Sequence, residues 1–345
     1  MQPFISVIIP VYNSEKVIGE CLGAAAEQDY PRDKIEVVMP DAGSSDNTLK
    51  IARSFKDRLD IKICKNPLKT GEAGKSVGID NAKGEILAFI DSDNIMPDKN
   101  FIKKMVEPFE KEADIMGAEP LYFTDRKQDR PLTRYFALSG VNDPLCLFIG
   151  NYDKYSYITG KWTGFKLKTT DRGGYFIVEL DEKKIPTIGA NGTFLRKECL
   201  MKANYRPYMF DIDVVYDMLR AGYGKFVKVK TGIAHIYAPT MKSFKRKQKR
   251  RINDFLYFSG EKKRTYPWAK MPLGGVFKFS LYCALFFPLL AQALAGFFRK
   301  RTPDWIYHIP VCYTTFFTYA GAFIKAKISG KTKIEDRDNW QRPAG

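Results

Sequence analysis

Short apolar runs alternate with helix-like stretches between residues 4 and 120. Four runs have the length and composition of buried strands: ISVIIPV (5–11), IEVVMP (35–40), IKICKN (61–66) and ILAFID (86–91). Helix-like stretches lie between them at 15–27, 46–56 and 74–82. This repetition of strand and helix predicts an α/β fold, in which a mixed but mostly parallel sheet carries helices on both faces.

Polar side chains follow the ends of these predicted strands. They are Tyr12, Asn13, Asp41, Asn66, Asp91 and Asp93. Ligands of parallel sheets bind at the carboxyl ends of the strands, so this edge is the predicted binding site. If extended geometry continues past Ile90, the carboxylates of Asp91 and Asp93 point to the same side and Ser92 points away.

The chain after residue 120 is less regular. Residues 121–190 are rich in Tyr, Gly and Asp, and DRGGYFIVELD (171–181) is typical of a turn followed by an edge or hairpin strand. Core-like sequence returns in IGANGTFLRKECL (188–200). The stretch DIDVVYDMLRAGYG (211–224) predicts a helix that ends at Gly222.

Positive charge is concentrated in one part of the chain. The formal charge of the whole chain is +17, and residues 225–301 hold 18 Lys and Arg against 2 acidic residues, which is +16. Such an asymmetry favours an anionic partner, either nucleic acid or acidic lipid. A solvated basic helix face is the ordinary alternative for a lysine-rich run.

The surroundings of the basic run favour the lipid. MKSFKRKQKRRINDFLYF (241–258) is followed by aromatic residues and then by the uncharged segments 279–298, which contains Pro288, and 305–324. Basic, aromatic and apolar residues in this order are typical of a membrane interface. We expect the following residues to contact phosphate groups of an anionic membrane surface: Lys245, Arg246, Lys249, Arg250 and Arg251. Nucleic acid is the disfavoured partner.

The flanks of the two apolar segments argue against a simple span. A hairpin of two spans would translocate RKRTPD (299–304), and a single span would translocate the tail 325–345, whose net charge is +3. Both violate the preference of Lys and Arg for the cytoplasmic side. We therefore favour interfacial or re-entrant helices at the cytoplasmic face of the cell membrane. The predicted organisation is a catalytic domain at 1–240, a basic interfacial segment at 241–270, and membrane-associated helices with a basic tail at 271–345.

Cysteine usage agrees with this compartment. The six cysteines are scattered, without a CxxC pair or a metal-type cluster, which is typical of reduced cytosolic thiols. The N-terminal FISVIIPVYN has the pattern of a core strand and turn, so we expect no signal peptide.

Several of these residues could carry chemistry. Asp91 and Asp93 can hold Mg²⁺ or Mn²⁺ together with substrate phosphates, and His235, after a predicted strand, is a candidate third ligand. The chain has neither a P-loop nor a GxGxxG motif. A solvated turn is the alternative for the aspartate pair. Asp41 can accept a hydrogen bond from a nucleobase or cap the following helix turn.

Asp211 has two readings as well. With Asp213 it begins the predicted helix, where a carboxylate ordinarily caps the N-terminus. The other reading is a general base that deprotonates an acceptor hydroxyl.

The ordered set of motifs resembles the family-2 glycosyltransferases of GT-A fold. It comprises VIIPVYN, IEVVMPDAGSSDNT, KTGEAGKSVGIDNAKGEILAFIDSDN, GANGTFLR and FDIDVVYDMLRAGY, and it covers roughly residues 4–240. The resemblance implies an enzyme that transfers a sugar from a nucleotide-sugar with inversion at the anomeric carbon. Within this family, the chain resembles membrane-associated mannosyltransferases that act on polyprenyl phosphates or glycolipids.

The resemblance also implies roles for single residues. Pro10, Tyr12, Asn13 and Asp41 match the base and ribose pocket, and Lys75 matches a basic position near the donor phosphates. Asp91, Ser92 and Asp93 match the DxD motif, with Asp93 on the metal and Asp91 nearer the ribose or sugar. Asn191 and Gly192 match the acceptor-side turn, Asp211 the catalytic base, and His235 the histidine that joins the metal.

Three positions depart from the family pattern. Pro40 stands where many relatives have an acid before Asp41, and Phe210 stands where Glu often precedes the base. The QxxRW motif of processive synthases is incomplete, because Gln248 and Arg251 are followed by Ile252. This disfavours a processive synthase.

We therefore expect an inverting glycosyltransferase that depends on Mn²⁺ or Mg²⁺ and uses a membrane lipid or lipid-linked acceptor. GDP-mannose is the favoured donor, and a UDP-sugar transferase or polysaccharide synthase is the alternative. A membrane- or nucleic-acid-binding module with an inactive sheet domain is the non-enzymatic alternative. Glycoside hydrolysis fits the strand-end carboxylates less well, and a homo-oligomer is left open.

Overall fold

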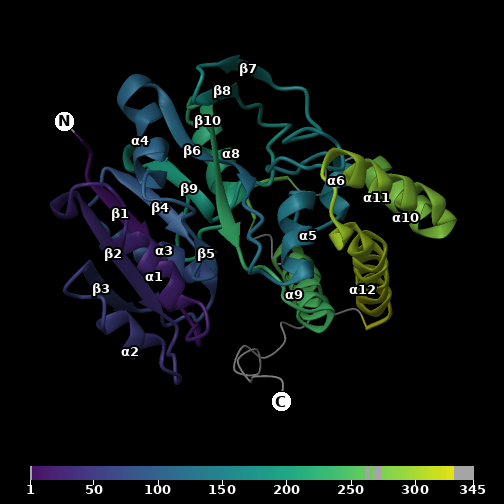
Figure 1. Ribbon diagram of the computed structural model, residues 1–345, viewed down its shortest axis with the longest axis horizontal. Coiled ribbons are helices and arrows are strands. Elements are labelled where there is room, and N and C mark those ends of the chain that lie inside the picture. Colours follow the sequence, from purple (N-terminus) through teal and green to yellow (C-terminus); the bar gives the residue numbers. More distant parts are fainter. Residues whose placement is uncertain (1, 261–263, 268–272, 330–345) are drawn as a thin grey trace. The chain divides into compact units, whose positions relative to one another are not determined.

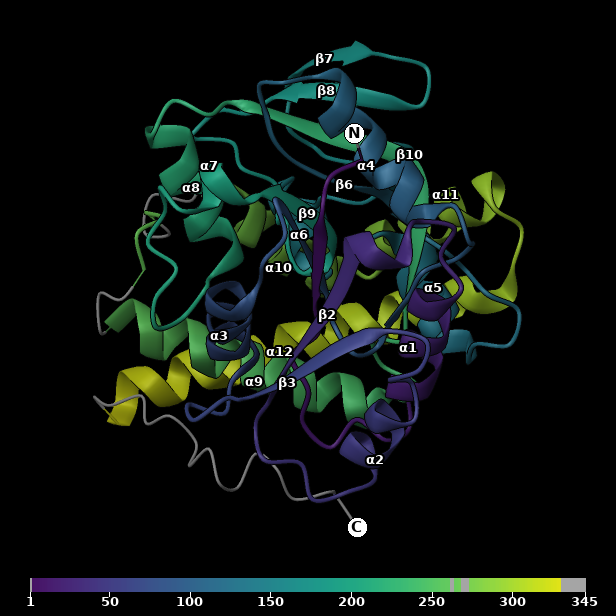
Figure 2. The same ribbon diagram turned by 90° about the vertical axis from the view of Figure 1, so that its left-hand side faces the viewer.

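The computed structural model describes residues 2–260, 264–267 and 273–329 (Figures 1 and 2). The chain divides into two compact units. Unit 1 comprises residues 1–124, 153–155 and 165–236, and unit 2 comprises residues 125–152, 156–164 and 237–345. The basic tail predicted at the C-terminus falls largely on residues 330–345, which lie outside the described residues.

Unit 1 is built on a ten-stranded sheet with the order β3-β2-β1-β4-β9-β6-β10-β8-β7, in which β5 also pairs with β10. The strands are β1 (Ile5–Ile8), β2 (Ile35–Asp41), β3 (Asp60–Lys65), β4 (Ile86–Ile90), β5 (Asn94–Ile95), β6 (Ile115–Phe123), β7 (Lys168–Asp171), β8 (Tyr175–Glu179), β9 (Asn191–Arg196) and β10 (Lys225–His235). Neighbours among β3, β2, β1 and β4 pair in parallel, and β9 runs antiparallel between β4 and β6. The mixed, mostly parallel sheet predicted from the pattern is confirmed.

The helices of unit 1 connect these strands. They are α1 (Ile18–Ala26), η1 (Arg32–Lys34), α2 (Thr48–Arg53), α3 (Gly71–Asn81), α4 (Phe101–Lys111), α7 (Lys197–Leu200) and α8 (Asp211–Arg220). The predicted strands and helices in the first 90 residues lie within a few residues of the observed ones. The hairpin predicted at 171–181 is confirmed as the β7–β8 pair.

Close packing between α3 and the sheet fixes the start of the site. A Cβ atom on Gly78 would lie 2.3 Å from Cγ2 of Ile8, and one on Gly74 would lie 2.9 Å from Cβ of Pro10. Glycine therefore permits the close approach of α3 to β1 and to Pro10, which follows β1 in the chain. This contact places the first turns of α3, and with them Lys75, against the carboxyl edge of the sheet.

Unit 2 is helical in the described residues. It contains α5 (Pro131–Ser139), α6 (Leu145–Ile149), α9 (Met241–Gly260), α10 (Gly274–Leu285), α11 (Phe287–Arg299), η3 (Pro303–Tyr307) and α12 (His308–Ser329). Helices α9 and α12 pack against each other (Figure 2). One core cluster joins Tyr135 and Phe136 of α5 to Phe244 and Trp305. This cluster explains why residues 125–152 group with the C-terminal helices. They lie within the catalytic domain predicted at 1–240, which precedes the segments predicted at 241–270 and 271–345.

The apolar segment predicted at 279–298 is not one helix. Helix α10 ends at Leu285 and α11 begins at Phe287, with an angle of 97° between them. Phe286 between them has a φ of +63°. Proline interrupts a helix interior but is tolerated in a first turn, so the chain restarts a new helix just before Pro288. The second segment, predicted at 305–324, is η3 followed by α12.

Replacement of Gly78 by alanine tests the close approach of α3 to β1. We expect Gly78→Ala to lower the free energy of unfolding by about 1–3 kcal/mol, because the new methyl group overlaps Ile8. Gly23→Ala on α1 is the matched control, since no atom lies within 4 Å of its Cβ position, and it should be neutral or stabilising by up to about 1 kcal/mol. Urea unfolding followed by circular dichroism measures both. Equal stabilities of the two variants would contradict the packing argument.

Candidate active site

The predicted base-pocket residues meet at the carboxyl ends of β1 and β2. After β1 the chain continues alongside β2, with the Val11 amide donating to the carbonyl of Pro40 at 3.0 Å. Asn13 adopts a φ of +44°, and its Oδ1 accepts a hydrogen bond from the Ser45 amide at 2.9 Å. Hydrogen bonds therefore join the loop after β1 to the loop after β2 in unit 1.

Asp41 caps the turn that follows β2. Its carboxylate accepts hydrogen bonds from the amides of Gly43 and Ser44, and from Oγ of Ser44 at 2.6 Å. Gly43 has a φ of +90°, which suits glycine. Asp41 thus caps the turn that precedes α2 (Thr48–Arg53) and not the helix itself, and contact with a nucleobase stays a prediction.

The DxD residues lie in a turn after β4 and not in an extended continuation of the strand. The Asn94 amide donates to the Asp91 carbonyl at 2.8 Å, which closes the turn. The alternation argument for Asp91 and Asp93 is therefore wrong, because the strand ends at Ile90. Ser92 is held by Ser14, with 3.0 Å between the two hydroxyl oxygens.

His235 reaches the DxD turn through strand pairing. It is the last residue of β10 and pairs with Asn94 of the short strand β5. The Ile236 amide donates to the Asp93 carbonyl at 2.9 Å, and Nε2 of His235 lies 3.5 Å from Oδ1 of Asp93. A carboxylate oxygen beside an imidazole nitrogen suits Mn²⁺ better than Mg²⁺, because Mg²⁺ prefers oxygen ligands.

The predicted three-ligand set is not preassembled by protein groups. Within the described residues, no three or more His, Cys, Asp or Glu side chains are grouped closely enough to hold a metal ion. Asp93 and His235 would supply two ligands and Asp91 a neighbouring carboxylate. The remaining ligand positions are thus left for donor phosphates and water, as is usual for ions that bind with a nucleotide.

Lys75 and Asp211 form an ion pair. The Nζ–Oδ1 distance is 2.6 Å, and the side chains are 6% and 28% exposed. Burial lowers the pKa of Lys75, but the negative charges of Asp211, Glu72 and Asp91 outweigh it, so the net shift is upward. Lys75 is therefore an ammonium ion at neutral pH. It was predicted near the donor phosphates, and its direct contact with Asp211 was not foreseen.

Asp211 is the first residue of α8, as predicted. The preceding Phe210 has no side-chain acceptor, so the acids of the first turn interact with the positive end of the helix dipole. A small cavity of about 10 Å³ lies against Asp211 and is bordered by Gly189 and Met209. The first-turn position of Asp211 is compatible with a catalytic role, because both the helix dipole and a general base call for a carboxylate at this position.

The acceptor-side turn links the two carboxylate regions. Ala190 accepts a hydrogen bond from the Asp91 amide at 3.3 Å, and a Cβ atom on Gly189 would lie 3.6 Å from Oδ2 of Asp211. Asn191 Oδ1 accepts from Nδ2 of Asn94 at 3.3 Å. Gly192 has a φ of +81°, where a Cβ atom would lie 2.8 Å from Ile233. The turn thus lies between the DxD residues and the predicted base.

Sequence reasoning missed the polar residues that hold this arrangement. Ser14 and Asn94 lie beside predicted motifs, but their partners Ser92 and Asn191 are distant in sequence. Glu119 offered a better signal, because it interrupts the apolar run IMGAEPLYF of β6. A charged residue in a buried strand indicates a specific partner.

The basic residues of α9 in unit 2 divide into two groups. Lys245, Arg246, Lys249 and Arg250 are exposed. Arg251 instead donates from Nη1 to the Asn142 carbonyl at 3.1 Å and lies 3.7 Å from Asp143, while Gln248 is buried and donates to the same carbonyl. Arg251 and Gln248 thus hold the loop before α6, and the phosphate contact of Arg251 stays a prediction.

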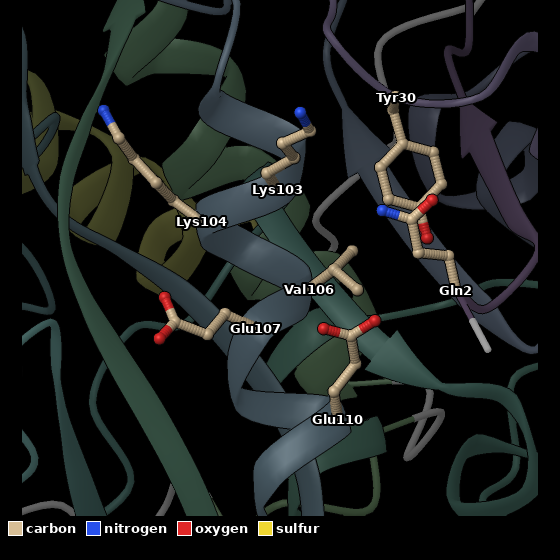
Figure 3. Close-up of a pocket in the computed structure, with 7 residues that line it drawn as sticks. All are labelled: Gln2, Tyr30, Lys103, Lys104, Val106, Glu107 and Glu110. Carbon is tan, nitrogen blue, oxygen red and sulfur yellow. The ribbon is translucent and has the colours of Figure 1, made fainter.

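A larger pocket of unit 1, about 280 Å³, lies elsewhere, beside α4 (Figure 3). It is lined by Gln2, Tyr30, Lys103, Lys104, Val106, Glu107 and Glu110. Lys103 and Lys104 pair with Asp29 and Asp98, and Glu107 pairs with Lys111. The pocket holds none of the predicted site residues, and these ion pairs satisfy much of its charge.

Comparisons with known proteins show which proteins this chain is similar to. The family model of glycosyl transferase family 2 matches residues 6–171. The glycosyltransferase AglE of Haloferax volcanii is 46% identical over 94 residues, which are 26% of this chain and 31% of that protein. A dolichyl N-acetyl-α-D-glucosaminyl phosphate 3-β-D-2,3-diacetamido-2,3-dideoxy-β-D-glucuronosyltransferase of Methanococcus voltae is 32% identical over 111 residues, 31% of this chain and 34% of that protein. The match thus spans about a third of the length of these curated relatives.

A solved structure supports the fold. The mannosyltransferase PcManGT from Pyrobaculum calidifontis, in complex with GDP-Man and Mn²⁺, superposes with a TM-score of 0.50 at 16% identity. The superposition covers 99% of this chain and 84% of that one. The sheet agrees with the GT-A fold of this structure, and the family model matches residues 6–171, so the chain carries a glycosyltransferase domain that is similar to glycosyl transferase family 2.

Proposed function

We propose that this chain is an inverting, divalent-metal-dependent glycosyltransferase that moves a sugar from a nucleoside diphosphate to an acceptor at a membrane surface. The observation that carries the proposal is the arrangement around residues 189–191. The Asp91 amide binds this turn on one side, and the Asp211 carboxylate lies against it on the other. A donor held at the DxD turn and an acceptor held at Asp211 would therefore be neighbours.

Asp211 is the proposed general base. Its carboxylate removes the acceptor proton while the acceptor oxygen attacks the anomeric carbon on the face opposite the leaving nucleotide. Lys75, 2.6 Å away, favours the ionised carboxylate and offers a positive charge to the departing diphosphate. Holding the donor and the acceptor on the two sides of the 189–191 turn raises the rate, because it keeps the reacting groups together in the right orientation.

Asp93 and His235 are the proposed metal ligands, assisted by Asp91. A bound Mn²⁺ or Mg²⁺ supplies Lewis-acid stabilisation of the diphosphate leaving group. The residues fit this group because Oδ1 of Asp93 and Nε2 of His235 are already within 3.5 Å of each other.

GDP-mannose is the proposed donor, and a UDP-sugar is the alternative. The proposal rests on the overall likeness of the motifs to membrane-associated mannosyltransferases. The named ligands of PcManGT, GDP-Man and Mn²⁺, belong to a protein that shares the fold. Pro10, Tyr12, Asn13 and Asp41 are the proposed base and ribose contacts, at the joined ends of β1 and β2.

A lipid or lipid-linked acceptor is proposed from the surface of unit 2. Many large apolar side chains of its C-terminal helices are exposed: Leu273, Val276, Phe277, Leu281, Leu285, Phe286, Phe287, Leu290, Leu294, Phe297, Phe298, Ile306, Phe317, Phe323, Ile324 and Ile328. Soluble monomers rarely expose so many together. Among the described residues, no single helix combines the length and apolar character to cross a bilayer, whereas the bent pair α10–α11 passes that test jointly.

These observations support interfacial or re-entrant docking of unit 2 on an anionic leaflet. Exposed Lys245, Arg246, Lys249 and Arg250 would meet lipid phosphates, each contributing about 1 kcal/mol. The Methanococcus voltae relative is by its name a transferase that acts on a dolichyl-phosphate-linked sugar. A polyprenyl-phosphate or glycolipid acceptor is the corresponding proposal for this chain.

Replacement of Asp211 tests the base assignment. Asp211→Asn should lower the turnover number for sugar transfer at least about 10³-fold, because the amide cannot accept the acceptor proton. Asp217→Asn on the same helix is the matched control, since its side chain accepts a hydrogen bond from the Asn204 amide that an amide oxygen can keep. Transfer is measured with radiolabelled donor and a lipid extract as acceptor. Full turnover by Asp211→Asn would exclude Asp211 as the base.

Nucleotide binding tests the donor and metal proposals. We expect GDP with Mn²⁺ to bind more tightly than UDP with Mn²⁺ in isothermal titration calorimetry. Asp93→Asn should weaken the Mn²⁺-dependent binding about 10- to 100-fold, whereas Asp98→Asn, which alters the exposed pair with Lys104, should not. A response confined to UDP would replace the GDP proposal by its alternative.

Vesicle sedimentation tests the docking surface. Phe287→Ser together with Phe298→Ser, at positions 75% and 74% exposed, should reduce binding to phosphatidylglycerol-containing vesicles at least about tenfold. Leu68→Ser in unit 1, also at an exposed position, is the control and should bind as the parent does. Unchanged vesicle binding by the double variant would contradict docking through α11.

A further inference from the structure

Four charged side chains of unit 1 are buried together. Glu119 of β6 binds Nζ of Lys154 at 2.5 Å and Nζ of Lys228 of β10 at 2.7 Å. Lys154 also contacts Oδ2 of Asp153 at 2.5 Å, and Lys228 donates to the Asp153 carbonyl. We refer to Glu119, Asp153, Lys154 and Lys228 as the buried quartet. Its two positive and two negative groups balance.

Strand register and chain connection assemble the buried quartet. Glu119 and Lys228 stand opposite each other in the parallel β6–β10 pair. The Tyr155 amide donates to the Leu121 carbonyl at 2.8 Å, which anchors residues 153–155 to β6. Burying an ion costs several kcal/mol unless partners surround it, so each member is held in place by the others. Burial is the main influence on Lys228 and lowers its pKa to about 8.

A contact of Asp153 leads from the buried quartet toward the site. Oδ2 of Asp153 is engaged by Lys154, and Oδ1 accepts a hydrogen bond from Oγ1 of Thr187 at 3.0 Å. Thr187 lies in residues 185–189, which form neither helix nor strand. A segment of this kind depends on side-chain contacts for its position.

The segment after Thr187 contacts both carboxylate regions. Two residues on, the Cβ position of Gly189 is 3.6 Å from Oδ2 of Asp211. Three residues on, the Ala190 carbonyl accepts from the Asp91 amide. The Gly189 carbonyl accepts from Oγ1 of Thr193 at 2.5 Å, so β9 holds the far end of the segment while Asp153 holds the near end.

We propose that Asp153 is a positioning residue, which sets the 187–190 segment against Asp211 and the DxD turn through its hydrogen bond to Thr187. This inference rests on the proposed function, since it concerns alignment of the acceptor with the base. Asp153 touches neither substrate nor metal in this role. The rest of the buried quartet fixes the Asp153 carboxylate and contributes no proton to the reaction.

The test replaces the Thr187 hydroxyl and leaves the buried quartet intact. Thr187→Val keeps the shape of the side chain but removes the donor, and Thr187→Ser keeps the donor. Thr170→Val on exposed β7 is the control for the threonine-to-valine change. The turnover number and KM for sugar transfer, the Kd of the donor nucleotide with Mn²⁺ and the thermal midpoint are measured for each.

We expect Thr187→Val to lower the turnover number about tenfold, while the donor Kd stays within twofold and the protein stays folded. Thr187→Ser and Thr170→Val should retain the parental turnover number. In an Asp211→Asn background, Thr187→Val should have no further effect, because neighbouring residues that act as a unit are not additive. Transfer by the parent protein establishes the proposed function separately.

Two results would overturn the inference while the parent protein still transfers sugar. One is a turnover number for Thr187→Val equal to that of the parent, even if the thermal midpoint falls, which would reduce the bond to a structural role. The other is an equal loss in Thr187→Ser, which would show that the hydroxyl is not what positions the segment. Absence of transfer in the parent would instead overturn the proposed function.

Discussion

The path of β10 is the constraint on which the rest of the site depends. This eleven-residue strand pairs with β6, β8 and β5, and its register against β6 shifts between Val229 and Gly232. A Cβ atom on Gly232 would lie 2.4 Å from Tyr122 and Thr124 side-chain atoms, so glycine permits the close approach there. Beyond this shift β10 reaches β5, and His235 meets Asp93. The same strand carries Lys228 into the buried quartet.

The local elements of the sheet unit were predictable because each is specified by nearby residues. The apolar runs at 35–40 and 86–91 became β2 and β4, and the resemblance found the matching family. Long-range partners were harder. The ion pair of Lys75 with Asp211 joins residues 136 positions apart, and the contact of Ser14 with Ser92 joins residues 78 apart. Neither pairing leaves a periodic signal in one sequence, since each depends on how α3, α8 and the strand ends are packed.

The structure departs from simple sequence patterns at two places, for identifiable physical reasons. The extended register of Asp91 and Asp93 assumed that β4 continues, but the turn closed by Asn94 ends it. The apolar stretch 279–298 has the composition of one helix, yet the chain bends at Phe286 just before Pro288. The composition shows that these residues are apolar. The division into two helices follows from proline, which is disfavoured in a helix interior. The exposed apolar residues of the 279–298 stretch are therefore spread over two short helices.

The segments of the two units alternate along the chain, and this limits how the protein can be cut into fragments or recombined with others. The chain leaves unit 1 after Thr124, returns for residues 153–155, leaves again and re-enters at Phe165. No single cut separates the two units. A fragment that stops at residue 240 would keep α5 but lose Phe244 and Trp305, which bury Tyr135 and Phe136. The sheet unit and the helical unit are therefore interleaved along the chain, and neither can be exchanged by joining two coding segments end to end.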